Sequence, residues 1–345
     1  MTVLEREPLS VPAAVKRELL VELRQLVVDY ESPGKRVRAV DHVDLEIHAG
    51  EIVGLAGESG CGKSTIANAI LQILREPARV TGGEIRFQGE NLLGKSREEL
   101  RSYRWRNVSM VFQSAMNALN PVMRVGEQFL DMMQAHERIS KRDALRRAGE
   151  LLDLVGIDPR RTRAYPHQLS GGMRQRVVIA MALALEPELV IMDEPTTALD
   201  VVVQREILQQ VQDLQRERGF AVLFITHDLS LLFEFAHRVA IMYAGEIVEE
   251  GSAAHLHEHA RHPYTLGLMR SFPPLTGPIA RMTGIPGAPP NLASPPAGCR
   301  FNPRCPHCDP AVDRELFDLQ TSVRPQLREV EVGHTVACHL VERGL

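Results

Sequence analysis

One glycine-rich stretch constrains this chain more than any other feature. It reads Gly57-Glu58-Ser59-Gly60-Cys61-Gly62-Lys63-Ser64, with Thr65 directly after it. The spacing fits G-x-x-x-x-G-K-S/T, in which the glycines let successive backbone N–H groups converge on phosphate oxygens. Lys63 brings a compact cation to the outer phosphates, and the Ser64 hydroxyl is placed to coordinate Mg²⁺. The stretch therefore predicts a loop that binds a nucleoside triphosphate.

The residues on either side of this loop support the same interpretation. Residues 51–56 are mostly apolar and predict a buried strand, and residues 65–74 predict an amphipathic helix. A strand, a glycine loop and a helix in this order point the helix N-terminus at the phosphates. We therefore prefer a phosphate-binding loop to a chance glycine-rich turn.

Length and composition limit the other possibilities. A chain of 345 residues suggests one domain of about 200 to 250 residues and a smaller part. The net charge of −4 does not indicate a protein that binds nucleic acid through an overall positive charge. The longest apolar run, Val177–Leu185, is too short to span a bilayer, and residues 1–16 lack the apolar core of a signal peptide. We expect a cytosolic protein with no membrane span of its own.

Hydrophobic periodicity divides the chain into a leader, an α/β domain and an extension. We expect a loose leader at 1–18, an α/β domain at 19–250 and an extension at 251–345. Within the domain, strands at 20–30 and 37–48 predict an antiparallel layer. The pattern becomes helical at about 115–180, with helices at 125–137 and 141–155. The fold class is therefore α/β with an antiparallel β layer and an α-helical subdomain.

Polar residues follow several of the predicted elements. The strand at 189–194 ends in Asp193 and Glu194, where Mg²⁺ beside a phosphate loop needs an acidic partner. Gln113 follows the strand at 108–112, and His227 follows the strand at 220–226. Ser170, Gly171 and Gly172 precede a helix that we expect to run through Glu186. Alone, they would be read as an N-terminal cap.

Together these motifs resemble the ATP-binding cassette family over about residues 20–250. Leu169-Ser170-Gly171-Gly172-Met173 is similar to the family's signature sequence, with Met where Gln is commoner. The remaining matches are the Q-loop residue Gln113, the Walker B pair Asp193 and Glu194, the D-loop Ala198-Leu199-Asp200, the switch residue His227, and Tyr30 at the position of the adenine-stacking aromatic. The resemblance implies a RecA-like core.

In that family two cassettes dock head to tail, and each ATP lies between one phosphate loop and the other chain's signature. The resemblance implies that Glu194 is the general base and that His227 contacts the γ-phosphate. It implies that Ser64, Gln113 and Asp193 hold Mg²⁺, and that Ser170, Gly171 and Gly172 reach the partner's ATP. The implied nucleotide contacts within the chain are Tyr30, Gly57, Ser59, Gly60, Cys61, Gly62, Lys63, Ser64, Thr65, Gln113 and Asp193.

Three further stretches resemble the dipeptide and oligopeptide importers of this family. They are the long Q-loop Phe112–Pro121, His262-Pro263-Tyr264-Thr265, and the extension from Ile285 through Gly298–Pro306 to Cys338. The branch implies a second ATPase, identical or not, two membrane permeases and an extracytoplasmic solute-binding protein. It places the chain at the cytoplasmic face of the membrane. Oligosaccharides and nickel are alternative solutes in this branch.

Two other function classes are weaker alternatives. A soluble cassette protein of DNA repair would need a long coiled coil within the cassette, and one of translation would need two cassettes in the chain. The second class is a zinc module that binds nucleic acid, but the arginine content near Cys299 and Cys305 is slight. We expect no nucleic-acid partner.

The extension carries Cys299, Cys305, Cys308 and Cys338, and a cysteine cluster in a reducing compartment favours metal over disulfides. The resemblance implies a 4Fe–4S cluster with a structural role, although the family's third cysteine lies near Val312 or Asp313. Zinc is the alternative, with His307 or His334 as further ligands. The remaining interpretation is four reduced, partly buried thiols.

Overall fold

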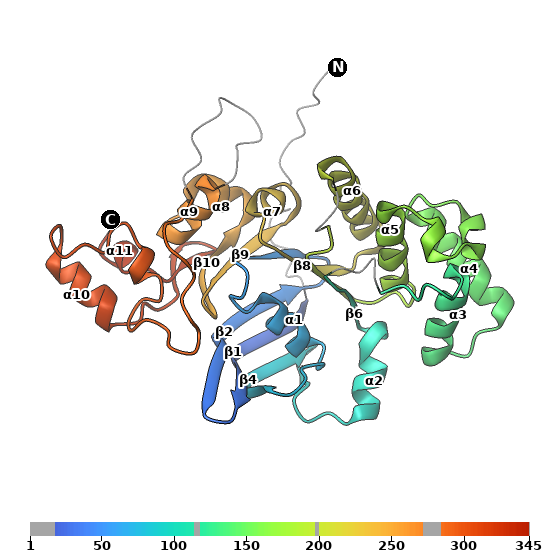
Figure 1. The fold of residues 1–345 in the computed structure, drawn as a ribbon, viewed down its shortest axis with the longest axis horizontal. Helices are drawn as coiled ribbons and strands as arrows, with labels where there is room; N and C mark the ends of the chain where they lie inside the picture. Colours follow the sequence, from blue (N-terminus) through green and yellow to red (C-terminus); the bar gives the residue numbers. More distant parts are fainter. Residues whose placement is uncertain (1–17, 114–117, 197–199, 272–283, 345) are drawn as a thin grey trace, which may run out of the picture. The chain divides into compact units, whose positions relative to one another are not determined.

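The computed structural model describes residues 18–113, 118–196, 200–271 and 284–344. The predicted leader therefore lies, apart from its last residue, outside the described part. The chain divides into two compact units (Figure 1). The first unit is formed by residues 1–46, 52–89 and 226–345, and the second by residues 47–51 and 90–225.

An antiparallel sheet forms one layer of the first unit. Its strands β1 (Leu19–Ser32), β2 (Lys35–His48) and β4 (Ala78–Phe87) lie in the order β2-β1-β4. The register between β1 and β4 runs from Val21 opposite Phe87 to Tyr30 opposite Ala78. The predicted antiparallel layer is therefore confirmed.

The second sheet of this unit carries the phosphate loop. Strand β3 (Ile52–Ala56) is buried along its whole length and pairs in parallel with β9 (Arg238–Tyr243). A strand covered on both faces needs a continuous apolar run, and this one provides it. Strand β10 (Glu246–Ser252) pairs antiparallel with β9 across a tight turn at Ala244 and Gly245. The two strands therefore form a β-hairpin.

The C-terminal extension adds two strands to the edge of that sheet. Strand β12 (His334–Val336) pairs with β10, and β11 (Arg328–Glu331) pairs with β12. Four helices accompany them, namely α8 (Ala253–His259), α9 (Pro263–Arg270), α10 (Arg314–Ser322) and α11 (His339–Glu342). Residues 286–298 are rich in Pro, Gly and Ala and form no helix or strand.

A buried pair fixes the extension to this edge. Nε2 of His334 lies 2.9 Å from Oε1 of Glu249, and both side chains are almost completely buried. The same carboxylate accepts hydrogen bonds from the backbone N–H groups of Arg261 and His262 at 2.6 and 3.2 Å. Such a network holds β12 in register because a buried carboxylate without its donors is costly.

Among the described residues, the second unit contains three neighbouring parallel strands and five α-helices. Its strands β6 (Val108–Val111), β7 (Leu189–Asp193) and β8 (Ala221–Thr226) lie in the order β8-β7-β6. The helices are α2 (Arg97–Arg106), α3 (Val125–His136), α4 (Lys141–Leu154), α5 (Gly171–Ala182) and α6 (Val201–Arg218). Helix α4 contacts both α3 and α5, which gives the expected helical region (Figure 1).

Three predicted ends differ from the observed ones. Helix α1 runs from Lys63 to Ile70 rather than over 65–74, because Gln72 has a φ of 53° that a helix cannot continue. Strand β7 ends at Asp193, and Glu194 follows it with a φ of 45°. Helix α5 ends at Ala182 rather than Glu186, which itself has a φ of 52°. Local backbone turns of this kind leave little trace in apolar periodicity.

Candidate functional site

The phosphate loop joins β3 to α1 with a backbone that requires glycine. Gly57 has a φ of 153° and Gly62 a φ of 114°. A Cβ on Gly57 would lie 2.1 Å from the carbonyl oxygen of Met242, and one on Gly62 would lie 2.3 Å from that of Ala39. No side chain fits at these distances, so the loop is shaped by glycine at both positions.

Lys63 lies folded over this loop. Its ammonium donates hydrogen bonds to the carbonyl oxygens of Gly57 at 2.7 Å and Glu58 at 3.0 Å, and the side chain is buried. The amine is thus held at the centre of the loop, where the outer phosphates of a nucleotide would lie if the motif binds as its spacing predicts. Ser64 is exposed, as a metal-binding hydroxyl needs to be.

Two other predicted residues of the loop region have structural partners. The hydroxyl of Tyr30 lies 3.3 Å from that of Thr65, so the aromatic ring at the end of β1 is tied to the first turn of α1. Cys61 is buried, and burial raises the pKa of its thiol. At neutral pH this thiol is therefore a small apolar side chain rather than a nucleophile.

In the second unit, the carboxyl ends of parallel strands bring predicted residues together. Asp193 ends β7 and is buried, and Gln113 follows β6. The amide Nε2 of Gln113 donates a hydrogen bond of 3.0 Å to Oε2 of Glu194. The backbone N–H of Glu194 donates to the carbonyl of Ile225 at 2.9 Å, which fixes the left-handed turn after β7. The resulting group of two carboxylates and an amide has the ligand types that Mg²⁺ prefers.

The signature residues form the exposed start of helix α5. The Ser170 side chain accepts a hydrogen bond from the backbone N–H of Met173 at 3.3 Å, and Gly171 and Gly172 form the first turn. Ser170 is exposed and the two glycines are half-buried. A helix N-terminus without bulky side chains offers backbone N–H groups to an anion.

His227 lies just after β8, in the first unit, and is exposed. Asp228 next to it caps α7 (Leu229–Phe235) by accepting from the backbone N–H of Ser230 at 3.0 Å. Residues 114–117 of the predicted long Q-loop and 197–199 of the predicted D-loop lie outside the described residues. Asp200, the last D-loop residue, caps α6.

The cysteines do not form the predicted metal centre in the part of the chain that the structure describes. No group of three or more His, Cys, Asp or Glu side chains there is arranged to hold a metal ion. Burial raises the pKa of the Cys299 thiol to about 12 and that of Cys305 to about 11, so both are neutral thiols near pH 7. A thiol that binds a metal does so as the thiolate, so a metal bound here would displace these protons. The predicted zinc ligand His334 is instead paired with Glu249.

Sequence reasoning missed the residues that hold the phosphate loop from outside. Glu58 is paired with Arg304 of the extension, and its backbone N–H donates to the hydroxyl of Tyr264 at 2.9 Å. Tyr264 is in turn placed by His262, whose Nδ1 accepts from the Tyr264 N–H at 3.0 Å. Burial lowers the pKa of His262 to about 3, so the ring is neutral and able to accept. The only sequence signal was that Tyr264 and Arg304 lie in stretches that resemble the dipeptide and oligopeptide importers.

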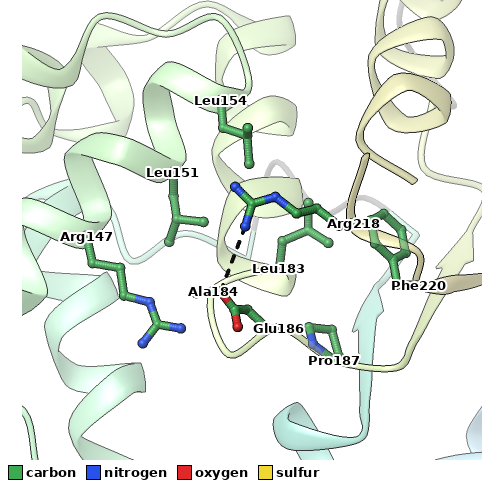
Figure 2. Close-up of a pocket in the computed structure, with 9 residues that line it drawn as sticks. All are labelled: Arg147, Leu151, Leu154, Leu183, Ala184, Glu186, Pro187, Arg218 and Phe220. Carbon is green, nitrogen blue, oxygen red and sulfur yellow. Dashed lines mark ion pairs between the residues drawn. The ribbon is translucent and has the colours of Figure 1, made fainter. Parts of the chain in front are cut away.

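One hollow in the second unit lies apart from all of these motifs. It has a volume of about 170 Å³, with an apolar floor that includes Leu151, Leu183 and Phe220. Figure 2 shows Arg218 reaching towards Glu186, with 3.9 Å between the charged atoms. None of its lining residues belongs to a nucleotide motif, and we assign it no role in the chemistry.

No helix among the described residues is long and apolar enough to cross a membrane.

Family models match two separate parts of the chain. The model described as "ABC transporter" matches residues 40–197, and that described as "Oligopeptide/dipeptide transporter, C-terminal region" matches residues 248–311. The first match covers the phosphate loop, Gln113, the signature and the Asp193–Glu194 pair. The second covers Tyr264 and Arg304.

Curated relatives resemble the chain over most of its length. A probable peptide ABC transporter ATP-binding protein of Sinorhizobium fredii is 45% identical over 94% of this chain and 95% of its own. The oligopeptide transport ATP-binding protein OppD of Bacillus subtilis is 45% identical over 82% and 80%. The dipeptide transport ATP-binding protein DppD of the same organism is 43% identical over 94% and 96%.

Solved structures agree with these relatives. A dimeric ATP-binding cassette in a post-hydrolysis state with ADP and Pi is 31% identical, with a TM-score of 0.61, over 68% of this chain and 99% of its own. Motifs, fold and relatives all lead to one conclusion. This chain belongs to the ATP-binding cassette family, as an ATPase of the dipeptide and oligopeptide transporter branch.

Proposed function

We propose that this chain powers a membrane importer of dipeptides or oligopeptides. The observation that carries the proposal is the C-terminal region at residues 248–311, because the cassette alone is shared by all branches of the family. The relatives named for oligopeptide and dipeptide transport match across both the cassette and this region. Oligosaccharides and nickel are the competing solutes.

The proposed chemistry is hydrolysis of ATP by positioning and electrostatics. The phosphate-loop N–H groups and Lys63 bind the phosphates, and Ser64 and Asp193 hold Mg²⁺. Glu194 accepts the proton of the attacking water. Its carboxylate accepts a hydrogen bond from Gln113, so Gln113 is placed to orient the water as well.

The remaining nucleotide contacts follow from the family pattern. We propose that His227 binds the γ-phosphate and that Tyr30 stacks on the adenine, where its tie to Thr65 would fix the ring. Ser170, Gly171 and Gly172 would bind the ATP of a second ATPase, since their helix N-terminus is exposed. The dimeric relative supports pairing of two cassettes.

The proposed assembly contains three kinds of component besides this chain. A second ATPase, identical or not, completes the two sites, and two permeases and an extracytoplasmic binding protein move the solute. The chain would then lie at the cytoplasmic face of the membrane, held there by the permeases. We place the boundary between the cassette and the extension near residue 250, although β12 of the extension pairs with β10.

From the resemblance we also propose that Cys299, Cys305, Cys308 and Cys338 hold a metal centre, with a 4Fe–4S cluster preferred to zinc. Anaerobically purified protein with about four irons per chain and broad visible absorption would establish the cluster. Colourless protein with one zinc would establish zinc instead, and protein with neither metal would leave four reduced thiols.

Transport into vesicles tests the proposal as a whole. The chain is reconstituted with its permeases, partner ATPase and binding protein, and ATP-dependent accumulation of a labelled tripeptide is compared with that of nickel and an oligosaccharide. We expect the tripeptide to accumulate and nickel and the oligosaccharide not to. With the matched Glu194→Gln variant, we expect none of the three solutes to accumulate. Accumulation of nickel or oligosaccharide without peptide would overturn the proposed solute while leaving the ATPase assignment intact.

A further inference from the structure

Every polar group of Glu58 in the phosphate loop is engaged. Its N–H donates to the Tyr264 hydroxyl at 2.9 Å, and its carbonyl accepts from the Lys63 ammonium at 3.0 Å. Its carboxylate forms two parallel hydrogen bonds with the Arg304 guanidinium, at 2.6 and 3.0 Å. Two of these three partners, Tyr264 and Arg304, lie beyond residue 250. The loop is therefore held partly by the C-terminal extension.

Arg304 is itself fixed on several sides. It is only 7% exposed, and its Nε donates to the carbonyl oxygen of Pro286 at 2.8 Å. Its guanidinium lies over the ring of Tyr243 at 5.9 Å from the centroid, and Nη1 reaches the hydroxyl of that ring at 3.4 Å. An arginine held in this way presents a planar fork with little rotamer freedom left to lose.

An aromatic cluster forms the base under this contact. Tyr243, Tyr264 and Phe301 are nearly fully buried, with ring centroids 4.5 to 5.5 Å apart. Each ring comes from a different element, namely β9, α9 and the turn before Arg304. Rings at these distances pack favourably, so Arg304 and Tyr264 reach Glu58 from a rigid base.

The charge of Glu58 gives this contact a functional consequence. The loop binds a polyphosphate, and an unpaired carboxylate in the loop would repel it, because like charges at short range oppose binding. We infer that Arg304 is a positioning residue for nucleotide binding: it fixes Glu58 and neutralises its carboxylate, so that the C-terminal extension sets the ATP affinity of the phosphate loop. The inference rests on ATP binding by the family and not on the identity of the transported solute.

Equilibrium binding to the full chain tests the inference directly. ATP displaces a fluorescent ATP analogue from the wild type and from Arg304→Met, which keeps apolar volume but removes the charge. We expect the dissociation constant for ATP to rise about three- to thirtyfold in the variant, the range expected for a coupling contact. In the assembled transporter the KM for ATP should rise while kcat at saturating ATP stays within about twofold.

A second substitution separates this role from a purely structural one. We attribute the loss of ATP affinity in Arg304→Met to the unpaired carboxylate of Glu58. Adding Glu58→Gln to the same chain removes that charge. The double variant should recover ATP affinity to within about threefold of the wild type. If Arg304 only stabilised the fold, Glu58→Gln would restore nothing.

Arg300→Met provides the matched control. Arg300 lies in the same segment, is also mostly buried and pairs with Asp41 and with Glu246 at 2.8 Å rather than with Glu58. Its loss should lower the unfolding temperature without changing the ATP dissociation constant by more than about twofold, and Glu58→Gln should not compensate for it. Unfolding temperature is measured for every variant.

If Arg304→Met does not fold, Arg304→Lys replaces it, since it retains the charge but not the two parallel bonds. We then expect a smaller loss of affinity, because the lysine ammonium still neutralises Glu58 but no longer fixes it through two parallel bonds. Unchanged ATP affinity in a folded Arg304 variant, or a loss in Arg304→Met that Glu58→Gln does not relieve, would overturn the inference. Failure of peptide transport with normal ATP binding would count against the proposed solute only.

Discussion

The two units hold their predicted site residues in different ways. In the first unit, Lys63 is buried and its ammonium is bonded to loop carbonyls, so contacts within the unit hold the phosphate loop. In the second unit, Gln113 and Ser170 are exposed, and the contact between Gln113 and Glu194 lies at the surface. The phosphate loop is therefore held by contacts within its own unit, whereas the site residues of the second unit are exposed.

This difference indicates a division of labour between binding and hydrolysis. A loop fixed by its own unit can bind phosphates without waiting for another chain. Exposed groups at a helix N-terminus and after a strand acquire their function only when substrate and a second cassette arrive. Substitutions in the first unit should therefore alter ATP affinity, and those in the second unit should alter turnover.

The largest expected effect is on turnover, in Glu194→Gln. The variant keeps a side chain of the same shape but cannot accept a proton, so ATP hydrolysis in the assembled transporter should fall about 100- to 10,000-fold. ATP binding should persist and a dimer with bound ATP should accumulate, which size-exclusion chromatography in the presence of ATP detects. Turnover near that of the wild type would show that another group is the base.

A smaller effect, on affinity, is expected for Lys63→Ala. The ammonium is a charge-assisted donor to phosphate oxygens, and losing such bonds should weaken ATP binding about 10- to 100-fold. Isothermal titration of the full chain with ATP measures this. Lys141→Ala, on the exposed start of α4, is the matched control and should bind as the wild type does. Normal affinity in Lys63→Ala with reduced turnover would remove the distinction between the units.

Much of the fold could be predicted because its signals are local. The run of apolar residues in β3, the glycines of the loop and the helical pattern of α3 and α4 each reflect neighbours in sequence. The same holds for Asp193 and Glu194, which directly follow an apolar strand. The phosphate loop, the two sheets and the helical region were all anticipated for this reason.

The extension could not be predicted in the same way. Strand β12 has only three residues and is defined by pairing with β10 about 85 positions earlier, as the separation of Glu249 and His334 illustrates. The Arg304–Glu58 contact joins residues 246 positions apart, and no periodicity encodes such a pair. The clustered cysteines suggested a metal centre, but spacing alone does not fix where four thiols lie.

We expect the ATP site of this chain to be completed by another chain, because the signature residues lie at the exposed start of α5. ATP turnover per chain is measured over a wide range of protein concentration and again with the matching ATPase and permeases. We predict low turnover for the isolated chain that rises steeply with concentration or with its partners. We also predict that Ser170→Arg abolishes this rise without changing ATP affinity, because the substitution obstructs the exposed start of α5. Full turnover of an isolated monomer, independent of concentration, would contradict the claim.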